Sequence, residues 1–410
     1  MSAYKSDLLR LLDERGHIHQ VTDPVALDKL ACDETITAYV GFDPTAPSLH
    51  VGNLASIMLL KRVQQAGHKP IVIMGGGTAK VGDPSGKDDT RQMLTAQKLR
   101  DNITSIRGSF EKILDFGRGP TGALLIDNDD WLSKLGYIEL LRDVGPHFTI
   151  NRMLTFDSVQ LRLEREQPLT FLEFNYMILQ AYDFLKLSRD HGCRLQLGGS
   201  DQWGNIVNGI ELGRRMDGAE LFGVTAPLIT KSDGSKMGKT ASGAVWLNEA
   251  QLPAWDFWQY WRNTDDRDVG RFLRLFTDLP LSEIAVLEKL EGSEINAAKV
   301  LLANEVTKMV RGEEAARAAE QTAAATFGAG GLGEDLPVLE VPGEGIGIAA
   351  ACTALGFTAS NGEAKRKIAE GAVRIDDQPV TDIGFVVEVA AGAERKLSLG
   401  KKKHAVLRGA

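Results

Sequence analysis

Five short motifs in this chain combine side chains of the kind that bind phosphate, ribose or a polar substrate. The first is His50-Val51-Gly52-Asn53, which follows a turn shaped by Pro44 and Pro47. A helix that begins at His50 exposes unpaired N–H groups and a partial positive charge, which suit a phosphate. Gly52 has no side chain to obstruct such a ligand. The alternative for this motif alone is a helix cap with an incidental histidine.

Two further motifs carry cations in loops. Gly82-Asp83-Pro84-Ser85-Gly86-Lys87, with Arg91 beyond it, lacks the spacing of a Walker A loop, but its cations are placed to reach phosphate. The segment from Lys231 to Thr240 holds three lysines and two glycines, and a mobile loop of this kind can neutralise developing phosphate charge. Taken alone, the first motif also fits a plain turn and the second fits a solvated surface loop.

The last two motifs place polar groups in apolar or glycine-rich surroundings. Tyr176, Gln180 and Asp183 fall at positions i, i+4 and i+7, on one face of a predicted helix whose other positions are mostly apolar. An unpaired buried polar group costs about 1–3 kcal/mol, so this stripe requires partners, either internal or from a ligand. The segment Gly198 to Asn205 (GGSDQWGN) contains Asp201, which suits a ribose hydroxyl, although a structural turn is the alternative.

The elements that must position these motifs alternate between strands and helices. Strands are predicted at 37–42, 70–74, 124–126 and 195–197, and a helix at 50–65 has its apolar residues at helical spacing. This alternation indicates an α/β fold with a Rossmann-type, doubly wound parallel sheet. Ligands of such sheets bind at the carboxyl ends of the strands, which is where the motifs fall.

The amino-acid composition is that of an ordinary globular protein. The chain has 410 residues, 43% hydrophobic and 25% charged, which excludes disorder or a collagen-like structure for the chain as a whole. It has no apolar stretch of the ~18–20 residues that a membrane helix needs, and its charged N-terminus does not resemble a secretory signal. The three cysteines are scattered without metal-binding spacing, so we expect no metal site and a reducing, cytoplasmic location.

Charge and pattern divide the chain into parts. We expect a catalytic domain at 1–249, an α-helical domain at 250–327, a Gly/Pro-rich acidic linker at 328–345 and a small α+β domain at 346–410. Residues 361–410 carry a charge of +3, with ten Lys/Arg and seven Asp/Glu, whereas the rest of the chain carries −11. A basic C-terminal part on an acidic body favours nucleic-acid binding at that end.

The five motifs occur together and in one order, which five independent accidents would not produce. This combination resembles the bacterial tyrosyl-tRNA synthetases, a family of class I aminoacyl-tRNA synthetases. His50-Val51-Gly52-Asn53 is similar to the class signature HIGH, and Lys236-Met237-Gly238-Lys239-Thr240 to KMSKS. The segments GFDPTAPSLH, GDPSGK, the helix of Tyr176 and Asp183, and GGSDQWGN are similar to those of the tyrosyl members.

The resemblance implies that the enzyme activates L-tyrosine with Mg·ATP and transfers it to the 3′ end of tRNA-Tyr. It implies a tyrosine site made by Tyr39, Asp83, Tyr176, Gln180, Asp183 and Gln202, with Tyr39 and Asp183 at the phenol. It implies an ATP site that includes Gly41, Asp43, Gly52, Gly199, Asp201 and Lys239. The residues expected to act on the phosphates are Thr45, His50, Asn53, Lys87, Arg91, Lys236, Lys239 and Thr240.

The resemblance also covers the C-terminal part and the assembly. It implies that RNA phosphates meet Lys365, Arg366, Lys367, Lys401, Lys402 and Lys403, and that the protein is a homodimer. Two residues depart from the signatures: Asn53 replaces the second histidine of HIGH, and Gly238 replaces the serine of KMSKS. We expect activity to survive the first change, and we expect the second to make the loop more flexible.

Three other functions were weighed against this one. A small cofactor adenylyltransferase would share the HxGH helix start but would have neither the KMGKT loop at this distance nor a basic C-terminal part. A tryptophanyl-tRNA synthetase would not need the pair Tyr39 and Asp183, because indole offers one N–H donor and no hydroxyl. A synthetase-derived RNA-binding protein without aminoacylation activity would have eroded phosphate-binding residues.

Overall fold

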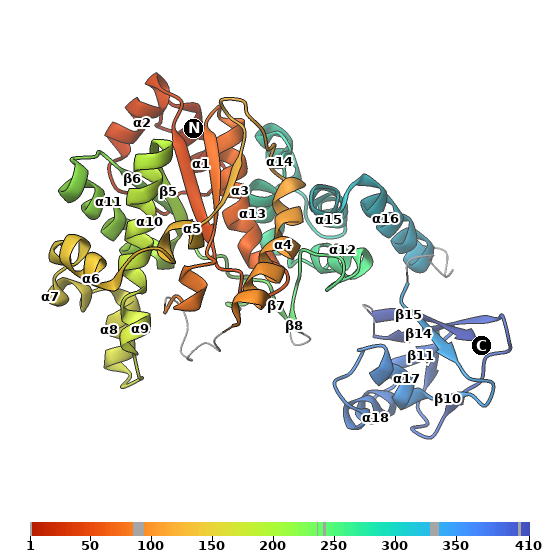
Figure 1. Cartoon of the computed structure of the whole chain (residues 1–410). Coiled ribbons are helices and arrows are strands. Elements are labelled where there is room, and N and C mark those ends of the chain that lie inside the picture. Colours follow the sequence, from red (N-terminus) through yellow and green to blue (C-terminus); the bar gives the residue numbers. More distant parts are fainter. Residues whose placement is uncertain (1, 85–93, 236, 241–242, 329–335, 401–402) are drawn as a thin grey trace. The chain divides into compact units, whose positions relative to one another are not determined.

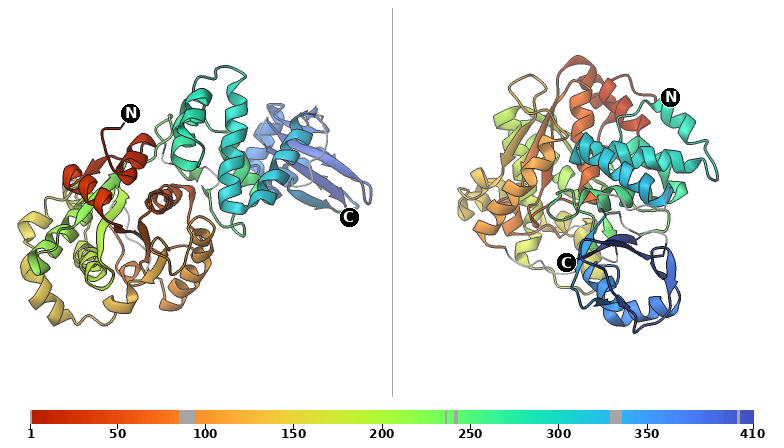
Figure 2. Two further views of the ribbon diagram at one scale, coloured as in Figure 1. Left: turned by 90° about the horizontal axis from the view of Figure 1, so that it is seen from above. Right: turned by 90° about the vertical axis from the view of Figure 1, so that its right-hand side faces the viewer.

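The computed structural model describes residues 2–84, 94–235, 237–240, 243–328, 336–400 and 403–410 (Figure 1). The chain forms two compact units. The first comprises Met1–Gly238, Trp246–Leu252 and Thr264–Leu302, and the second comprises Lys239–Val245, Pro253–Asn263 and Ala303–Ala410. Figure 2 gives two further views of the elements. Within the described part of the chain, no helix has both the length and the apolar character needed to cross a membrane.

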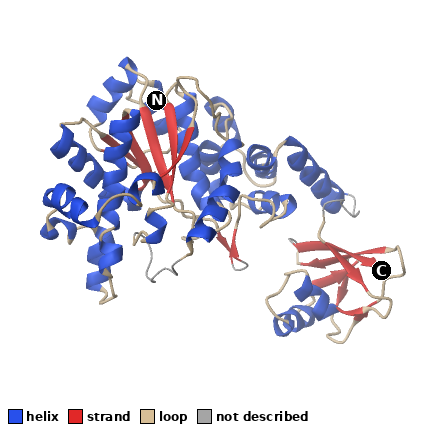
Figure 3. Cartoon of the chain, in the orientation of Figure 1, coloured by secondary structure: helices blue, strands red, loops and turns tan. Residues whose placement is uncertain are grey.

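A six-stranded sheet forms the centre of the first unit (Figure 3). Its strand order is β1-β6-β5-β2-β3-β4, and all neighbours are parallel except β1, which pairs antiparallel with β6. The strands are β1 (Gln20–Val21), β2 (Thr37–Phe42), β3 (Lys69–Met74), β4 (Leu124–Asp127), β5 (Cys193–Gly199) and β6 (Phe222–Ala226). The four strands predicted from the sequence are therefore confirmed, whereas β1 and β6 were not predicted.

Helices cover both faces of this sheet, as expected for a doubly wound fold (Figure 1). Helix α3 (Val51–Gln65) packs on β2 and β3, and α10 (Tyr176–His191) and α11 (Trp203–Asp217) pack on β5. The face toward α10 buries Tyr39, Ile71 and Ile73 against Phe184, whose ring meets that of Tyr39 edge to face at 5.2 Å. Because these apolar side chains fix α10 to the sheet, they also fix the polar stripe that the helix carries.

The strand order reverses beside β2, and ligands of such sheets usually bind at this point. The chain runs from β2 outward through β3 to β4, whereas β5 and β6 lie on the other side of β2. Loops that leave the carboxyl ends of β2 and β5 therefore diverge to opposite faces, which is the usual ligand position in open α/β sheets. The segments that follow β2 and β5 are the ones that contain HVGN and GGSDQWGN.

The remaining helices of the first unit surround this core. They are α1 (Asp7–Glu14), α2 (Pro24–Asp33), α4 (Ala96–Glu111), α5 (Asp129–Leu132), α6 (Tyr137–Glu139), α7 (Ile150–Met153), α8 (Asp157–Glu164), α9 (Phe171–Phe174), α13 (Asp266–Phe276) and α14 (Leu281–Leu287). Short 3₁₀ or π turns lie at Thr78–Lys80, Leu140–Val144, Gly145–His147 and Ser200–Gln202. From Ala254 to Gly328 every regular element is an α-helix, in agreement with the helical pattern of residues 250–327.

The second unit contains helices and a small α+β domain. Its helices are α12 (Ala254–Arg262), most of α15 (Ile295–Arg311, which begins in the first unit), α16 (Glu313–Gly328), α17 (Ile348–Ala354) and α18 (Asn361–Ala369). The strands are β7 (Lys239–Thr240), β8 (Gly243–Ala244), β9 (Val338–Val341), β10 (Ile346–Gly347), β11 (Val373–Ile375), β12 (Gln378–Val380), β13 (Val386–Val387), β14 (Glu394–Leu399) and β15 (Lys403–Gly409).

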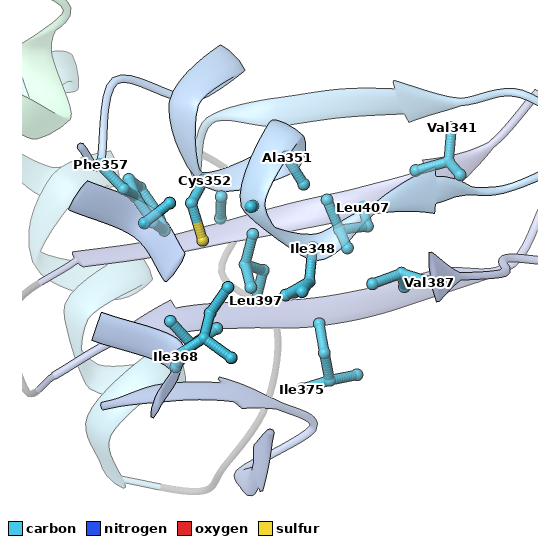
Figure 4. Packing of buried hydrophobic residues seen from close by; sticks show 14 of the residues in the cluster. Val341, Ile348, Ala351, Cys352, Phe357, Ile368, Ile375, Val387, Leu397 and Leu407 are labelled. Atoms are coloured by element: carbon cyan, nitrogen blue, oxygen red, sulfur yellow. The ribbon is translucent and has the colours of Figure 1, made fainter. Parts of the chain in front are cut away.

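The C-terminal domain is a five-stranded sheet of order β12-β11-β14-β15-β9 with α17 and α18 packed on it. Figure 4 shows its core, in which Ile348, Cys352 and Ile368 from the helices meet Leu397 and Leu407 from the strands. The expectation of a linker over 328–345 is wrong in part. Strand β9 lies within that range and pairs in parallel with β15, so the segment from Val338 belongs to the C-terminal sheet. Residues 329–335 lie outside the described part of the chain.

Candidate active site

Tyr39 on β2 and Asp183 on α10 are two buried polar residues that interact electrostatically. Tyr39 is 1% exposed, and its hydroxyl is buried without a hydrogen-bond partner. Asp183 is 3% exposed, and its two carboxylate oxygens accept hydrogen bonds from Trp131 Nε1 and Asn128 Nδ2, each at 2.8 Å. Burial, followed by the charge of Asp183, raises the pKa of Tyr39 well above 10, so this hydroxyl stays protonated. One unpaired hydroxyl thus lies near a carboxylate that is already oriented.

The pKa of Asp183 is raised to about 7. Burial is the main cause, the hydrogen bonds from Asn128 and Trp131 oppose it, and the charges of Asp43 and Asp127 add to the rise. Without a ligand, the carboxyl group is therefore near the midpoint of its titration at neutral pH. A ligand that donates a hydrogen bond to it would stabilise the ionised form.

A continuous line of hydrogen bonds connects Asp183 to the loop after β2. Asn128 Nδ2 also donates to Thr78 Oγ1 at 3.1 Å, and Thr78 Oγ1 donates to Asp43 Oδ1 at 2.9 Å. Asp43 Oδ2 in turn accepts from the hydroxyl of Tyr176 at 3.3 Å. Asp43, predicted for the ATP site, is therefore bonded directly to Tyr176, which was predicted for the tyrosine site.

A second polar group gathers where α10 faces the start of α11. Gln180 Nε2 donates to Gln202 Oε1 at 3.3 Å, Gln202 Nε2 donates to Asp83 Oδ2 at 2.8 Å, and Asn205 Nδ2 donates to Gln202 Oε1 at 3.1 Å. Gln180 Oε1 is buried without a hydrogen-bond partner. The structure therefore brings together three residues that are far apart in sequence, Asp83, Gln180 and Gln202, as one acceptor-rich wall.

The start of α3 is held by its own side chains. His50 Nδ1 accepts from the N–H of Gly52 at 3.0 Å, and the N–H of His50 donates to Asn53 Oδ1 at 3.1 Å, which makes a reciprocal cap. Because Nδ1 is an acceptor, the proton of the neutral imidazole lies on Nε2. Thr45 is exposed in the turn before this helix. Asn53, a departure from the class signature, is thus a capping residue.

Glycines lie near the carboxyl ends of β2 and β5. A Cβ atom at Gly41 would meet no atom within 4 Å, and this residue is exposed although it lies in a central strand. Gly199 ends β5, and a Cβ atom there would lie 2.6 Å from Asp201 Oδ1. Asp201 itself is exposed, in the turn at Ser200–Gln202. These positions allow a flat group to approach the backbone closely.

The structure describes part of the segment from Lys231 to Thr240, which we call the lysine loop. Lys231 N–H donates to the carbonyl of Ser235 at 2.8 Å, and Met237 N–H donates to that of Ile229 at 3.1 Å. Of the predicted phosphate-binding residues, Lys87, Arg91 and Lys236 lie outside the described residues. Lys239 and Thr240 form β7, and only their backbone is described.

The basic residues predicted to bind RNA lie in the C-terminal domain. Lys365 and Arg366 are exposed on α18, and Lys367 Nζ donates to Glu370 Oε2 at 2.8 Å. Lys403, at the start of β15, donates to the carbonyl of Phe357 at 2.5 Å. Lys401 and Lys402 lie outside the described residues.

Several residues of the site were missed in the sequence. Asn128 and Trp131 follow β4, and the rule applied to the other strands, that ligand residues follow a strand end, would have found them. Nothing in the sequence indicated a role for Thr78 except its position directly after three glycines. Gln196 is the register partner of Tyr39 on β5, is 2% exposed, and has a buried Oε1 without a hydrogen-bond partner. Its signal, a glutamine inside an apolar strand, was visible in the sequence.

The fold and the site define a class I aminoacyl-tRNA synthetase. The profile of the family described as tRNA synthetases class I (W and Y) matches residues 31–328, and the chain belongs to this family.

The relatives point to one member of that family. The chain is 68% identical to a protein of Novosphingobium aromaticivorans over 410 residues, the full length of both, and that protein is named tyrosine–tRNA ligase. It is 59% identical over 407 residues to the tyrosine–tRNA ligase of Zymomonas mobilis, with 99% of each chain covered. Among solved structures, the C-terminally truncated mitochondrial tyrosyl-tRNA synthetase of Aspergillus nidulans is similar with a TM-score of 0.72 and 29% identity, covering 79% of this chain and 95% of that one.

Proposed function

We propose that this chain is a tyrosine–tRNA ligase that works in two steps. In the first, a carboxylate oxygen of L-tyrosine attacks the α-phosphorus of ATP, and the bond to pyrophosphate breaks. In the second, a hydroxyl of the 3′-terminal adenosine of tRNA-Tyr attacks the tyrosyl carbonyl, and AMP leaves. Both steps depend on positioning and charge stabilisation, because the substrates themselves supply the nucleophiles.

The observation that carries the choice of amino acid is the pair of Tyr39 and Asp183. A tyrosine phenol would donate to the Asp183 carboxylate and accept from the buried Tyr39 hydroxyl, which has no partner of its own. Phenylalanine would leave the buried Tyr39 hydroxyl without a partner and would give Asp183 no further donor, which is costly. The indole of tryptophan offers a single donor and no acceptor for Tyr39.

The acceptor-rich wall suits the α-ammonium group of the amino acid. The hydroxyl of Tyr176, the unpartnered Oε1 of Gln180 and the carboxylate of Asp83 would accept from it, and Gln202 links Gln180 to Asp83. The positive ammonium group would also offset the negative charge that Asp43, Asp83 and Asp183 concentrate in the pocket.

ATP would occupy the open end of the sheet between β2 and β5. The adenosine would lie against Gly41, Gly52, Gly199 and Asp201, and Asp43 would bridge the nucleotide and amino-acid sides. Thr45, His50 and Asn53 at the start of α3 and the cations Lys87, Arg91, Lys236 and Lys239, with Thr240, would receive the phosphates. His50 would donate from Nε2, because Nδ1 is already an acceptor. Mg²⁺ would enter as part of the nucleotide substrate.

The C-terminal domain would bind the tRNA through its basic residues on α18 and at the start of β15. Such contacts to phosphates depend on salt. A catalytic domain at 1–249, a helical domain at 250–327, a linker that ends before Val338 and a cytoplasmic location complete the proposal.

We also propose that the chain is a homodimer through the segment 137–174, which includes α6 to α9 (Figure 1). Within the described residues, large apolar side chains that are exposed concentrate there: Tyr137, Ile138, Leu141, Ile150, Leu154, Leu161, Leu163, Phe171 and Leu172. Large exposed apolar side chains gathered in one segment are typical of an interaction surface. A closed homodimer would bring the same surface of two copies together about a two-fold axis. Phe171→Glu should shift the mass in analytical ultracentrifugation from dimer to monomer, and an unchanged dimer would contradict this interface.

The experiment that tests the function is ATP–pyrophosphate exchange with each amino acid in the absence of tRNA. Exchange with tyrosine alone is expected. Exchange with tryptophan would keep the class of enzyme and overturn the reading of the pocket. A folded protein that exchanges with no amino acid would instead be an RNA-binding protein derived from a synthetase.

A further inference from the structure

Gly238 occupies the position at which the class signature has serine, and its conformation is one that serine rarely adopts. Its φ is +85°, in the left-handed region that favours glycine. Backbone hydrogen bonds join described residues of the segment before it, and this segment is also bonded to α13. The N–H of Ser232 donates to Asp268 Oδ2 at 2.8 Å, and Arg271 donates to the carbonyl of Thr230.

The backbone at Gly238 lies directly against the start of α3. A Cβ atom built on Gly238 would lie 2.8 Å from the backbone nitrogen of Gly52 and 3.2 Å from His50 Nδ1. The contact is close from the other side as well, since a Cβ atom on Gly52 would lie 3.3 Å from the carbonyl oxygen of Met237. Met237 is 4% exposed, so this part of the loop is packed down.

A side chain at position 238 cannot be accommodated by a small adjustment. The nearest atom is a backbone nitrogen inside a capped helix start, where the N–H of Gly52 is bonded to His50 Nδ1. The tip of a flexible side chain could move away, but this nitrogen cannot move without breaking the cap. The backbone of the loop would therefore have to lift off α3.

We propose that Gly238 is a positioning residue, whose missing side chain lets the lysine loop dock on Gly52 and His50. This inference rests on the proposed function, because docking matters through the lysines that flank Gly238 in the sequence. It reverses the expectation that glycine at this position only loosens the loop. It predicts that the serine of the class signature, placed in this chain, slows activation.

Gly234 provides a matched control in the same loop. Its φ is +82°, nearly that of Gly238, but a Cβ atom there would meet no atom within 4 Å. Gly234→Ala and Gly238→Ala therefore impose a similar backbone strain, and only the second adds the collision with Gly52. The difference between the two variants isolates the docking contact.

The test compares the full-length wild type with Gly234→Ala, Gly238→Ala and Gly238→Ser. Tyrosine-dependent ATP–pyrophosphate exchange gives kcat and the KM for ATP, and equilibrium dialysis gives the Kd for tyrosine. We expect Gly238→Ala to lower kcat about tenfold or more below Gly234→Ala, and Gly238→Ser to lower it at least as far, while the Kd for tyrosine stays within about twofold in all four proteins. A general loss of folding would instead weaken tyrosine binding together with kcat.

Two results would overturn the proposal, and they are separable. If the wild type exchanges with tyrosine and Gly238→Ala is as fast as Gly234→Ala, the docking role is wrong and the proposed function stands. If the wild type shows no tyrosine-dependent exchange, the proposed function fails, and the docking role fails with it.

Discussion

Asn128 and Asp183 are joined by a hydrogen bond of 2.8 Å from Nδ2 to Oδ2, and the orientation of the amide is fixed from its other side. Asn128 Oδ1 accepts from the N–H of Gly77 at 2.8 Å, so Nδ2 must face the carboxylate. The same Nδ2 donates to Thr78 Oγ1. One buried amide therefore orients the carboxylate that we propose binds the phenol, and connects it to the loop after β3.

Removing this amide should weaken tyrosine binding. Asn128→Ala takes a charge-assisted hydrogen bond from Asp183, a loss of roughly 1.5–3 kcal/mol, so we expect the Kd for tyrosine to rise about tenfold or more. The control is Asn102→Ala, which removes another buried amide, bonded to the carbonyl of Pro44, and should leave the Kd for tyrosine nearly unchanged. Equal effects of the two changes on tyrosine binding would show that Asn128 acts only through folding.

The hydroxyl of Tyr39 should act on selectivity more than on stability. Tyr39→Phe removes a group that has no partner in the free protein, so the folded state loses little. A neutral hydrogen bond contributes about 0.5–1.5 kcal/mol, so kcat/KM for tyrosine should fall roughly 2- to 15-fold. Phenylalanine makes no such bond, and its kcat/KM should not fall. Exchange assays with both amino acids measure the ratio, and a parallel loss for both would place the Tyr39 hydroxyl outside the phenol site.

The sequence predicted the elements and the polar stripe better than the contacts between them. Tyr176, Gln180 and Asp183 were found because a helical period places them on one face, which is a local property. The bond between Asp43 and Tyr176 joins residues 133 positions apart, and no local pattern encodes it. The four residues of β9 were predicted to lie in a linker, because the residues around them are acidic and rich in glycine. They form a strand because they pair with β15, which is distant in sequence.

Tyrosine binding should weaken as the pH falls below about 7. The pKa of Asp183 is raised to about 7 by burial, so in the free protein this carboxyl group takes up a proton near that pH. The ionised form accepts the phenol proton best, and the Kd for tyrosine should therefore rise toward tenfold per pH unit on the acid side. Neither the ammonium nor the carboxylate of tyrosine titrates between pH 5.5 and 8, so the profile reports on the protein. Isothermal titration over this range gives the midpoint, and Asp183→Asn should bind weakly with a flat profile.

The raised pKa of Asp183 also predicts that the stability of the fold depends on pH, with a sign opposite to that of tyrosine binding. Because the folded pKa of Asp183 lies above its unfolded value of about 3.8, the folded state holds more protons than the unfolded state between these values. The contribution of Asp183 to the free energy of unfolding is therefore greatest below about pH 4 and declines as the pH rises to 7. The difference in unfolding free energy between wild type and Asp183→Asn should follow this slope. A difference independent of pH would contradict the raised pKa.

Asp278 should contribute strongly to the stability of the first unit, because it neutralises the buried guanidinium of Arg62. Arg62 is fully buried, and its NH1 lies 2.5 Å from Asp278 Oδ1, while Lys61 Nζ lies 2.5 Å from Oδ2. Burial tends to raise the pKa of Asp278, but Lys61 and Arg62 outweigh it and lower the pKa to about 2, so the carboxylate stays ionised at acidic pH.

The substitution Asp278→Asn leaves the guanidinium of Arg62 buried without its counter-charge. Such a loss costs 3–5 kcal/mol when both partners are buried, and we expect about 2 kcal/mol here because the Asp278 side chain is 42% exposed. The control is Glu111→Gln, which breaks the exposed pair with Arg107 and should change the unfolding free energy by less than about 0.5 kcal/mol. Urea unfolding at pH 7 measures both, and a loss at Asp278 no larger than at Glu111 would show that Arg62 is satisfied by its bonds to the carbonyl of Thr277 and to Gln65 alone.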